Sequence, residues 1–405
     1  MKTKEIVLAF LFFSVVTGIF FYKTVLKGYV PFPGDLLIAE YSPWKTYSYL
    51  GYNPGSYPNK AQYFDVLRQI YPWKTFSIDS LKNGSFPLWN PYNFSGTPLL
   101  ANIQSAVFYP FNILYFVLPQ IFAWSSLIFL QPFLASLFTF IYARKIGLSR
   151  IASFFSATSF GFSSFMTVWL QYNTIGQVIL WLPLILLSIE NLLDKKTKFW
   201  SFIFIFSLVA SLFAGHIQIF AYIFVFSFVY SLFRKIKFYF LILFLLPLGL
   251  GAIQLIPSLE LINLAARSSH PYELLINKIL IQPWQLIMLF VPDFFGNPAT
   301  RNYLISDTYV GKVTSIGLVP LIFVLLTLLR KKNSLTKFFL WITGIVLLFV
   351  SLNPITYFLY KIKIPFISDS APTLSIFVLC FSLSVLSGFG VDIFRKENFN
   401  FKKYL

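Results

Sequence analysis

The stretch IFAWSSLIFLQPFLASLFTFIY at Ile121–Tyr142, followed by the basic turn ARKIGLSR at Ala143–Arg150, decides the fold of this chain. The first part carries no charged side chain and is long enough to cross a bilayer as a helix, which takes about 20 apolar residues. Basic residues collect in the cytoplasmic loops of membrane proteins, and the turn is rich in them. The pair therefore predicts a membrane helix that ends at the cytoplasmic surface.

The composition extends this prediction to the whole chain. Of its 405 residues, 57% are hydrophobic, 20% are aromatic and only 11% are charged. An average soluble domain carries about 25% charged residues. Because no soluble core could bury so much apolar surface, the composition excludes a soluble enzyme, a disordered protein and a nucleic-acid-binding module. The net charge of +18 is typical of basic cytoplasmic loops and requires no nucleic acid as partner.

The residues that usually bind metals or carry catalysis are scarce. The single cysteine, Cys380, lies in an apolar run, so the sequence offers no intrachain disulfide and no cysteine metal site. Two histidines, His216 and His270, are too few for most zinc or haem chemistry. The phosphate-binding, dinucleotide-binding, metalloprotease and serine-hydrolase motifs do not occur. We expect no cofactor and no metal site, with a bound divalent cation as the one open alternative.

Ten apolar segments are candidates for membrane spans. They are Ile6–Tyr22, Ile121–Tyr142, Ile151–Leu170, Ile175–Leu193, Phe199–Ala214, Ile217–Phe233, Phe238–Pro257, Val313–Leu329, Phe338–Leu352 and Thr373–Ile393. The first resembles a signal peptide, but no small-residue cleavage site follows it, so we interpret it as a retained anchor. The expected fold is an all-α polytopic membrane protein with about ten transmembrane helices, forming a single integral membrane domain over residues 1–405.

The basic residues alternate across these spans. With the N-terminus inside, the inner segments hold 19 of the 32 Lys and Arg residues. These are Lys2, Lys4, Arg144, Lys145, Arg150, Lys195, Lys196, Lys198, Arg234, Lys235, Lys237, Arg330, Lys331, Lys332, Lys337, Arg395, Lys396, Lys402 and Lys403. The alternation holds only if the apolar stretch Val107–Leu118 does not span, so we interpret it as an interfacial helix. Both termini are then cytoplasmic.

The same topology predicts three outer loops. A long first loop covers Lys23–Gln120, and shorter loops cover Ser258–Lys312 and Asn353–Pro372. Within the second loop, the apolar stretch Ile279–Val291 is expected to lie in the membrane interface. The first loop is rich in Pro, Gly, Asn, Tyr and Trp, a composition that favours packing over disorder.

The first loop contains a weak internal repeat. Asp35 precedes the run YSPWKTY at Tyr41–Tyr47, and Asp65 precedes the run YPWKTF at Tyr71–Phe76. Trp and Lys anchor chains at membrane surfaces, so both runs can simply rest on the membrane. The carboxylates are harder to explain in this way, because an Asp held near lipid is desolvated and a neutral residue would be favoured.

The most specific part of the loop is KNGSFPLWNPYNFSGTPLLAN at Lys82–Asn102, followed by QSAVFYP at Gln104–Pro110. These residues resemble the signature of YfhO-type bacterial membrane proteins, which are grouped with the glycosyltransferases of the C-type superfamily. Shorter matches complete the resemblance over most of the chain. They are Gly34-Asp35, Gly215-His216-Ile217-Gln218, Pro292-Asp293-Phe294-Phe295-Gly296, Gly311 and Ser387-Gly388-Phe389-Gly390-Val391-Asp392.

The resemblance implies an activity and a location. It implies transfer of a sugar from a polyprenyl-phosphate donor to a cell-envelope glycan or glycopolymer, on the outer face of a bacterial cytoplasmic membrane. Such a reaction needs a carboxylate as base for the acceptor hydroxyl and a cation for the departing phosphate. Asp35 follows the first span, where the superfamily keeps its catalytic Asp, so we rank it first and Asp65 second. A turn-forming role for Asp35 after Gly34 is the alternative.

Further residues are candidates for substrate binding. From the resembling motifs we take Trp89, Asn90, Asn102, Gln104, His216 and Asp293, and as phosphate-binding cations Arg267, Arg301 and Lys312. His216 could equally cap a helix, Asp293 could be structural, and isolated loop cations are commonly only solvated.

Two other classes of function stay open. A transporter or flippase for lipid-linked sugars would perform no chemistry, and an envelope-assembly protein would be a scaffold. Transporters commonly place ionisable residues at the bilayer midplane. Here the spans are almost free of charge, apart from Glu190 and Asp392 near their inner ends, while polar residues gather in the first loop. This distribution favours chemistry at the membrane surface over a translocation path.

Overall fold

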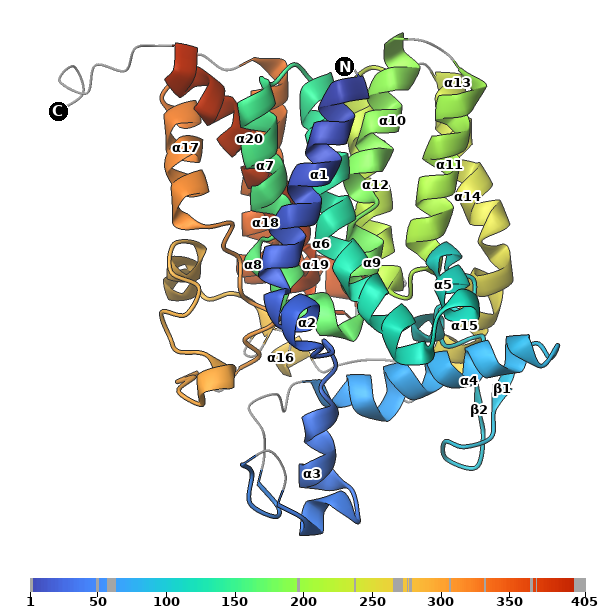
Figure 1. Ribbon diagram of the computed structural model, residues 1–405. Helices are drawn as coiled ribbons and strands as arrows, with labels where there is room; N and C mark the ends of the chain where they lie inside the picture. The colour runs from blue at the N-terminus through green and yellow to red at the C-terminus, as the bar shows by residue number, and fades with distance from the viewer. Residues whose placement is uncertain are drawn as a thin grey trace.

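The computed structural model describes most of the chain. The described residues are 3–48, 51–56, 63–194, 197–236, 238–264, 272–274, 276, 279–305, 307–330, 333–364, 367–368 and 370–396. They form a bundle of roughly parallel helices with most of the irregular chain at one end (Figure 1). We call that end the loop face and the opposite end, where α1 begins and α20 ends, the basic face.

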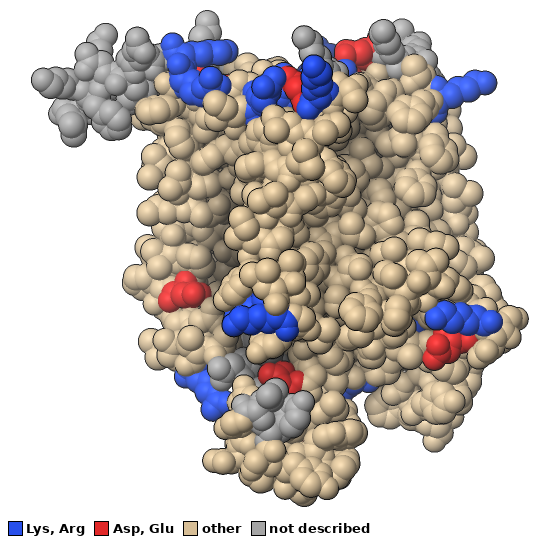
Figure 2. All heavy atoms as spheres, viewed as in Figure 1, with Lys and Arg blue, Asp and Glu red and all other residues tan. Residues whose placement is uncertain are grey.

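Among the described residues, six helical segments are long and apolar enough to cross a membrane. They are α1 (Thr3–Phe20), α6 (Gln120–Lys145), the run from α7 (Arg150–Gly161) through α8 (Ser164–Trp169) to η7 (Leu170–Tyr172), the run of α9 (Ile175–Ile179) and α10 (Leu182–Asp194), α18 (Ser334–Ser351), and η12 (Pro372–Ser375) with α20 (Ile376–Lys396). Figure 2 shows a broad uncharged band between two charged rims on the face in view. The chain is therefore a multi-pass helical membrane protein.

The remaining predicted spans are shorter or broken. Three apolar helices of intermediate length run within the bundle: α11 (Lys198–Phe213), α12 (Ile217–Phe233) and α17 (Leu318–Leu328). The predicted span Phe238–Pro257 is broken by a sharp bend. It consists of α13 (Phe238–Leu241), η8 (Ile242–Phe244) and α14 (Leu245–Leu250), followed by α15 (Ala252–Leu264), with a bend of 69°. Counted as one span, this pair brings the spans among the described residues to seven.

The bend occurs at Gly251, which lies between α14 and α15. A Cβ atom at this position would lie 2.1 Å from a Leu212 methyl carbon of α11. A larger side chain here would displace Leu212, so the glycine lets the bend lie close to α11. The turn directs α15 along the loop face.

The helix α20 lies at the centre of the bundle. Most of its residues are buried, and it packs against α7, α17 and α18. A Cβ at Gly390 would lie 1.9 Å from the backbone oxygen of Phe323 in α17. A Cβ at Gly388 would lie 2.8 Å from a methyl carbon of Leu148. These glycines let helix backbones approach closely, which is the usual basis of helix association in membranes.

The basic face is tied together by ion pairs between helices. Glu5 of α1 accepts hydrogen bonds from Arg144 at 3.4 Å and from Arg150 at 3.0 Å, on either side of the turn between α6 and α7. Glu190 of α10 accepts two hydrogen bonds from the Arg234 guanidinium, at 2.7 and 2.8 Å. Thus Glu190, which the sequence places near an inner end, is paired at this face and not at the middle of the bundle.

The loop face is built from short elements. In the first loop these are α2 (Tyr22–Lys27), η1 (Gly34–Leu36), α3 (Leu37–Glu40), η2 (Trp44–Thr46), η4 (Val66–Ile70), α4 (Tyr71–Lys82), the two-stranded ribbon β1 (Trp89–Asn90) and β2 (Thr97–Pro98), η5 (Ile103–Ser105), η6 (Pro110–Ile113) and α5 (Leu114–Val117). The later loops add α16 (Tyr272–Leu274), η10 (Pro283–Leu289), η11 (Pro298–Thr300) and α19 (Asn353–Ile362). The stretch Val107–Leu118 forms only short helices, none long enough to span.

Candidate functional site

The segment Leu100–Asn112, which we call the docked turn, is an irregular part of the loop face that is held by hydrogen bonds. Two side chains of α15 hold its start: Gln254 donates to the Leu100 carbonyl at 2.6 Å, and Ser258 donates to the Ala101 carbonyl at 2.8 Å. The amide of Asn112 donates to the Ala106 carbonyl at 2.7 Å and closes the turn. The bend at Gly251 thus serves the site, because it brings α15 to this segment.

A buried lysine lies against the docked turn. The Lys74 side chain of α4 is only 5% exposed, and its ammonium donates to the Ala106 carbonyl and to the Asn112 amide oxygen, both at 3.1 Å. Both acceptors are neutral, and no described carboxylate forms an ion pair with Lys74. Burial lowers the pKa of Lys74 to about 7. A buried ammonium without a counter-ion is costly, so it calls for a functional explanation.

The sequence pattern around Lys74 predicts a residue that anchors the chain at the membrane surface. Its position in α4 could have revealed more, because Ile70 and Ile78 lie one helical turn before and after it and are both buried. A charged residue in the middle of an apolar helical stripe was the available signal.

His216 follows a glycine that lies against the docked turn. The preceding residue, Gly215, has φ +102°, and a Cβ there would lie 3.2 Å from the Ala106 Cβ and 3.5 Å from the Gln104 carbonyl oxygen. The Nδ1 atom of His216 is buried and has no hydrogen-bond partner among the described residues. Burial lowers the pKa of His216 to about 4, so its imidazole is neutral at pH 7.

The predicted substrate-binding residues of the motif stabilise the loop itself. Trp89 packs on Gly96, where a Cβ would lie 2.5 Å from the indole ring. The Asn90 side chain is buried and bonds to Asn93 at 2.5 Å and to the Tyr92 backbone N–H at 3.0 Å.

The other two motif residues flank the short helix η5. The Asn102 side chain accepts a hydrogen bond from the Gln104 backbone N–H at 3.2 Å and so caps that helix. Gln104 is half-buried, and its backbone carbonyl oxygen lies beside Gly215.

Asp35 lies in η1 at the junction of the first loop with the bundle. The neighbouring Phe32 ring packs against Tyr71 of α4 and Trp124 of α6, with centroid distances of 4.7 and 6.1 Å. Leu36 is fully buried, so the backbone around Asp35 is held firmly. Asp35 itself is half-buried. Its Oδ1 atom is buried, so a fixed backbone holds a carboxylate with at least one oxygen shielded from solvent.

Asp65 and Asp293 approach a common group of tyrosines, which we call the tyrosine cluster: Tyr63, Tyr172 and Tyr309. The Tyr63 and Tyr172 rings lie 5.4 Å apart, and Asp65 is close enough to Tyr172 to act on its hydroxyl electrostatically. Burial and Asp293 raise the pKa of Tyr309, with a smaller contribution from Tyr63 nearby. The Tyr309 hydroxyl donates to Asp293 Oδ1 at 2.5 Å. The structure therefore brings two of the predicted site residues into one neighbourhood, from two different loops.

Asp293 is exposed, and its bonds occupy a single oxygen. Oδ1 also accepts from the Asn297 amide at 3.0 Å, while the described residues form no hydrogen bond with Oδ2. The exposed oxygen can therefore accept a hydrogen bond from a ligand hydroxyl.

A buried ion pair lies in the same loop region as Asp293. Lys312 and Asp307 are joined at 2.5 Å, with their side chains 1% and 6% exposed. Burial raises the pKa of Asp307, but hydrogen bonds from Lys312, Tyr303 and Gln285 outweigh burial and lower it. Lys312, which the sequence suggested as a phosphate-binding cation, is thus engaged in a buried ion pair.

The structure describes one of the two remaining predicted cations. Arg301 is exposed and ends η11 in a left-handed conformation, φ +57°. Arg267 lies outside the described residues. No group of three or more His, Cys, Asp or Glu side chains is arranged to hold a metal ion in the part of the chain that the structure describes.

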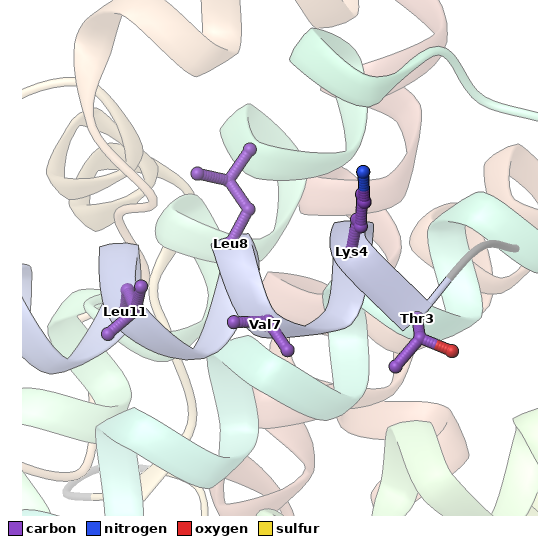
Figure 3. A pocket seen from close by; sticks show the side chains of 5 residues that line it. All are labelled: Thr3, Lys4, Val7, Leu8 and Leu11. Atoms are coloured by element: carbon purple, nitrogen blue, oxygen red, sulfur yellow. The ribbon is translucent and has the colours of Figure 1, made fainter.

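A separate open pocket lies on α1 near the basic face. It is lined by Thr3, Lys4, Val7, Leu8 and Leu11, which project from one helix (Figure 3). It contains none of the candidate residues and lies at the opposite end of the bundle from the docked turn (Figure 1).

Comparison with known proteins adds no further assignment, since no family model, curated protein or solved structure matches the chain. The fold and composition define the class, a multi-pass helical membrane protein. The resemblance to YfhO-type proteins stays a prediction.

Proposed function

We propose that this protein is a membrane glycosyltransferase. It would transfer a sugar from a lipid-phosphate donor to a cell-envelope acceptor, with the loop face on the outer side of a bacterial cytoplasmic membrane and ten spans in all. The observation that carries the proposal is the gathering of Asp65 and Asp293 at the tyrosine cluster, with Asp35 in the same loop face. Carboxylates beside aromatic rings at a membrane surface suit a polyhydroxylated substrate.

In this mechanism the carboxylates act on hydroxyl groups. Asp35, as general base, takes the proton of the acceptor hydroxyl as that oxygen attacks the anomeric carbon. The bond from this carbon to the donor phosphate breaks, and the phosphate leaves with the bonding electrons. Asp293 and Asp65 would orient sugar hydroxyls, because the exposed oxygen of Asp293 is available for a hydrogen bond. No protonating acid is needed, because a phosphate is already a good leaving group.

The proposal is tested by measuring transfer in membranes that contain matched amounts of each variant. Asp35→Asn keeps the shape of the side chain and removes its charge, so transfer should fall by roughly 10²–10⁴ while the protein still inserts. Asp65→Asn should have a smaller effect. Asp79→Asn is the matched control, since Asp79 is an exposed carboxylate of the same loop at the far end of α4.

Transfer at the wild-type rate by Asp35→Asn would leave Asp35 as a turn residue and move the role of base to Asp65. Wild-type transfer by Asp35→Asn, Asp65→Asn and the double variant would overturn the enzyme proposal. A flippase for lipid-linked sugars or an envelope-assembly scaffold would then account better for the fold.

A further inference from the structure

The charge of Lys74 has no use in the loop fold itself. An ammonium can donate three hydrogen bonds, and the two that are made go to neutral oxygens. A neutral side chain with two N–H groups, such as a glutamine amide, could make such bonds without the cost of burying a charge. The position therefore indicates that an anion completes the site.

The surroundings of Lys74 are apolar on the surface side. Directly after its partner Asn112 come Ile113, Phe116 and Val117, which are 62%, 46% and 69% exposed. Phe122, at the start of α6, is 61% exposed, and α6 is fixed to α4 by a hydrogen bond from Gln120 to Thr75 at 3.0 Å. An apolar surface next to a buried cation suits a molecule that has an anionic head and a hydrocarbon tail.

His216 supplies a second unused polar group near the docked turn. A Cβ at Gly215, the residue before His216, would lie 3.2 Å from the Cβ of Ala106, and the Ala106 carbonyl binds Lys74. A neutral imidazole can donate one hydrogen bond to a phosphate oxygen without adding charge.

We propose that Lys74, assisted by His216, binds the phosphate of a lipid phosphate at the docked turn. The third N–H of the Lys74 ammonium would donate to a phosphate oxygen, and the hydrocarbon chain would lie on the apolar surface formed by Ile113, Phe116, Val117 and Phe122. The inference deepens the proposed function, because it names the group that holds the donor phosphate. It can nevertheless be tested by binding alone, without any sugar transfer.

The experiment measures binding of farnesyl phosphate to the purified full chain in detergent, with farnesol and inorganic phosphate as separate probes. Farnesyl phosphate should bind more tightly than either. Lys74→Met should weaken that binding by roughly 10- to 100-fold, the loss expected for a hydrogen bond to a charged group, and should leave farnesol binding unchanged. Lys82→Met is the matched control, because Lys82 is exposed on the same helix.

Folding is followed separately, by thermal unfolding of each variant. Lys74→Met should be at least as stable as the wild type at pH 7, since it removes a buried charge. If it fails to fold, Lys74→Gln replaces it, because a glutamine amide can still donate to the docked turn without carrying charge. His216→Ala should weaken farnesyl phosphate binding less than Lys74→Met does.

Two results would overturn the inference: farnesyl phosphate binding that Lys74→Met and Lys74→Gln leave unchanged, or no binding to the wild type. Lys74-dependent binding of inorganic phosphate as tight as that of farnesyl phosphate would contradict a lipid ligand and indicate free phosphate. Lys74-dependent binding of farnesyl phosphate in a protein that transfers no sugar would support this inference while the proposed function fails.

Discussion

Lys74 shows how one residue can combine structure and chemistry. Its aliphatic stem is part of the buried face of α4, while its ammonium holds the docked turn through Ala106 and Asn112. A neutral residue could pack in the buried face of α4 and bond to the docked turn, and an exposed lysine could bind an anion. Only a buried lysine can do all of this. This double role explains why a side chain that is costly to desolvate is buried here.

The titration of Lys74 gives a prediction for stability against pH. Burial lowers its pKa from 10.5 to about 7, so between these values the unfolded chain binds the proton more tightly than the folded protein does. Stability should therefore rise with pH above 7, by up to about 1.4 kcal/mol per pH unit from this group. Thermal unfolding of wild type and Lys74→Met at pH 7 and pH 9 checks this. The rise should be smaller in the variant, and an equal rise in both would contradict the account.

The pair of Lys312 and Asp307 gives a second prediction at this scale. Asp307→Asn leaves the Lys312 charge buried without its partner, so it should destabilise the fold by about 3–5 kcal/mol. The double variant Lys312→Met/Asp307→Leu should recover most of that loss, because no charge is then left unpaired. Both are measured by unfolding in detergent. If Asp307→Asn were as stable as the wild type, the two charges would be solvated and not buried as a pair.

At the scale of helices and strands, local patterns were readable from the sequence and long-range contacts were not. The apolar segments and the basic turn at Arg144–Arg150 are local signals, and the structure forms helices where they predict them. The bend at Gly251 depends on contact with Leu212 of another helix, and the docked turn depends on Gln254 and Ser258. No local pattern contains such pairings.

The candidate site also shows this difference between local patterns and long-range contacts. Asp65 and Asp293 could be named from their motifs, but their approach to one tyrosine cluster required the fold. Asn90 was expected to bind substrate because of the motif around it. The structure shows its amide engaged within the ribbon turn, where an Asn commonly replaces backbone hydrogen bonds.

The packing of α20 predicts that its residue Gly390 does not tolerate a methyl group. Gly390→Ala would place a carbon 1.9 Å from the Phe323 carbonyl oxygen, so α17 and α20 would have to separate. We expect a loss of several kcal/mol and poor insertion. Gly344→Ala in α18 is the control, because nothing lies within 4 Å of its Cβ position and the helix should gain slightly. Equal expression and thermal stability of the two variants would refute close packing at Gly390.

At the scale of the whole molecule, the account requires that the loop face and the basic face lie on opposite sides of the membrane. The first two loops and their carboxylates are at one end, while Glu5, Arg144 and Arg150 are at the other (Figure 1). An even number of crossings between the start of α1 and the end of α20 follows from this arrangement.

The single cysteine makes this arrangement testable. In a Cys380→Ser background, Ser85→Cys on the loop face and Ser334→Cys at the start of α18 introduce one exposed thiol each. A membrane-impermeant maleimide added to intact cells should label Ser85→Cys, and should label Ser334→Cys only after permeabilisation. Labelling of both positions from outside would contradict the topology.

We propose that the loop face carries out sugar transfer. The most direct test is to measure transfer by the purified chain in lipid vesicles. The vesicles contain a radiolabelled polyprenyl-phosphate sugar as donor and an extract of cell-envelope glycans as acceptor. The account predicts that the wild type moves label from lipid to glycan and that Asp35→Asn does so at least 100-fold more slowly. No transfer by the folded wild type, or equal transfer by Asp35→Asn and wild type, would contradict it.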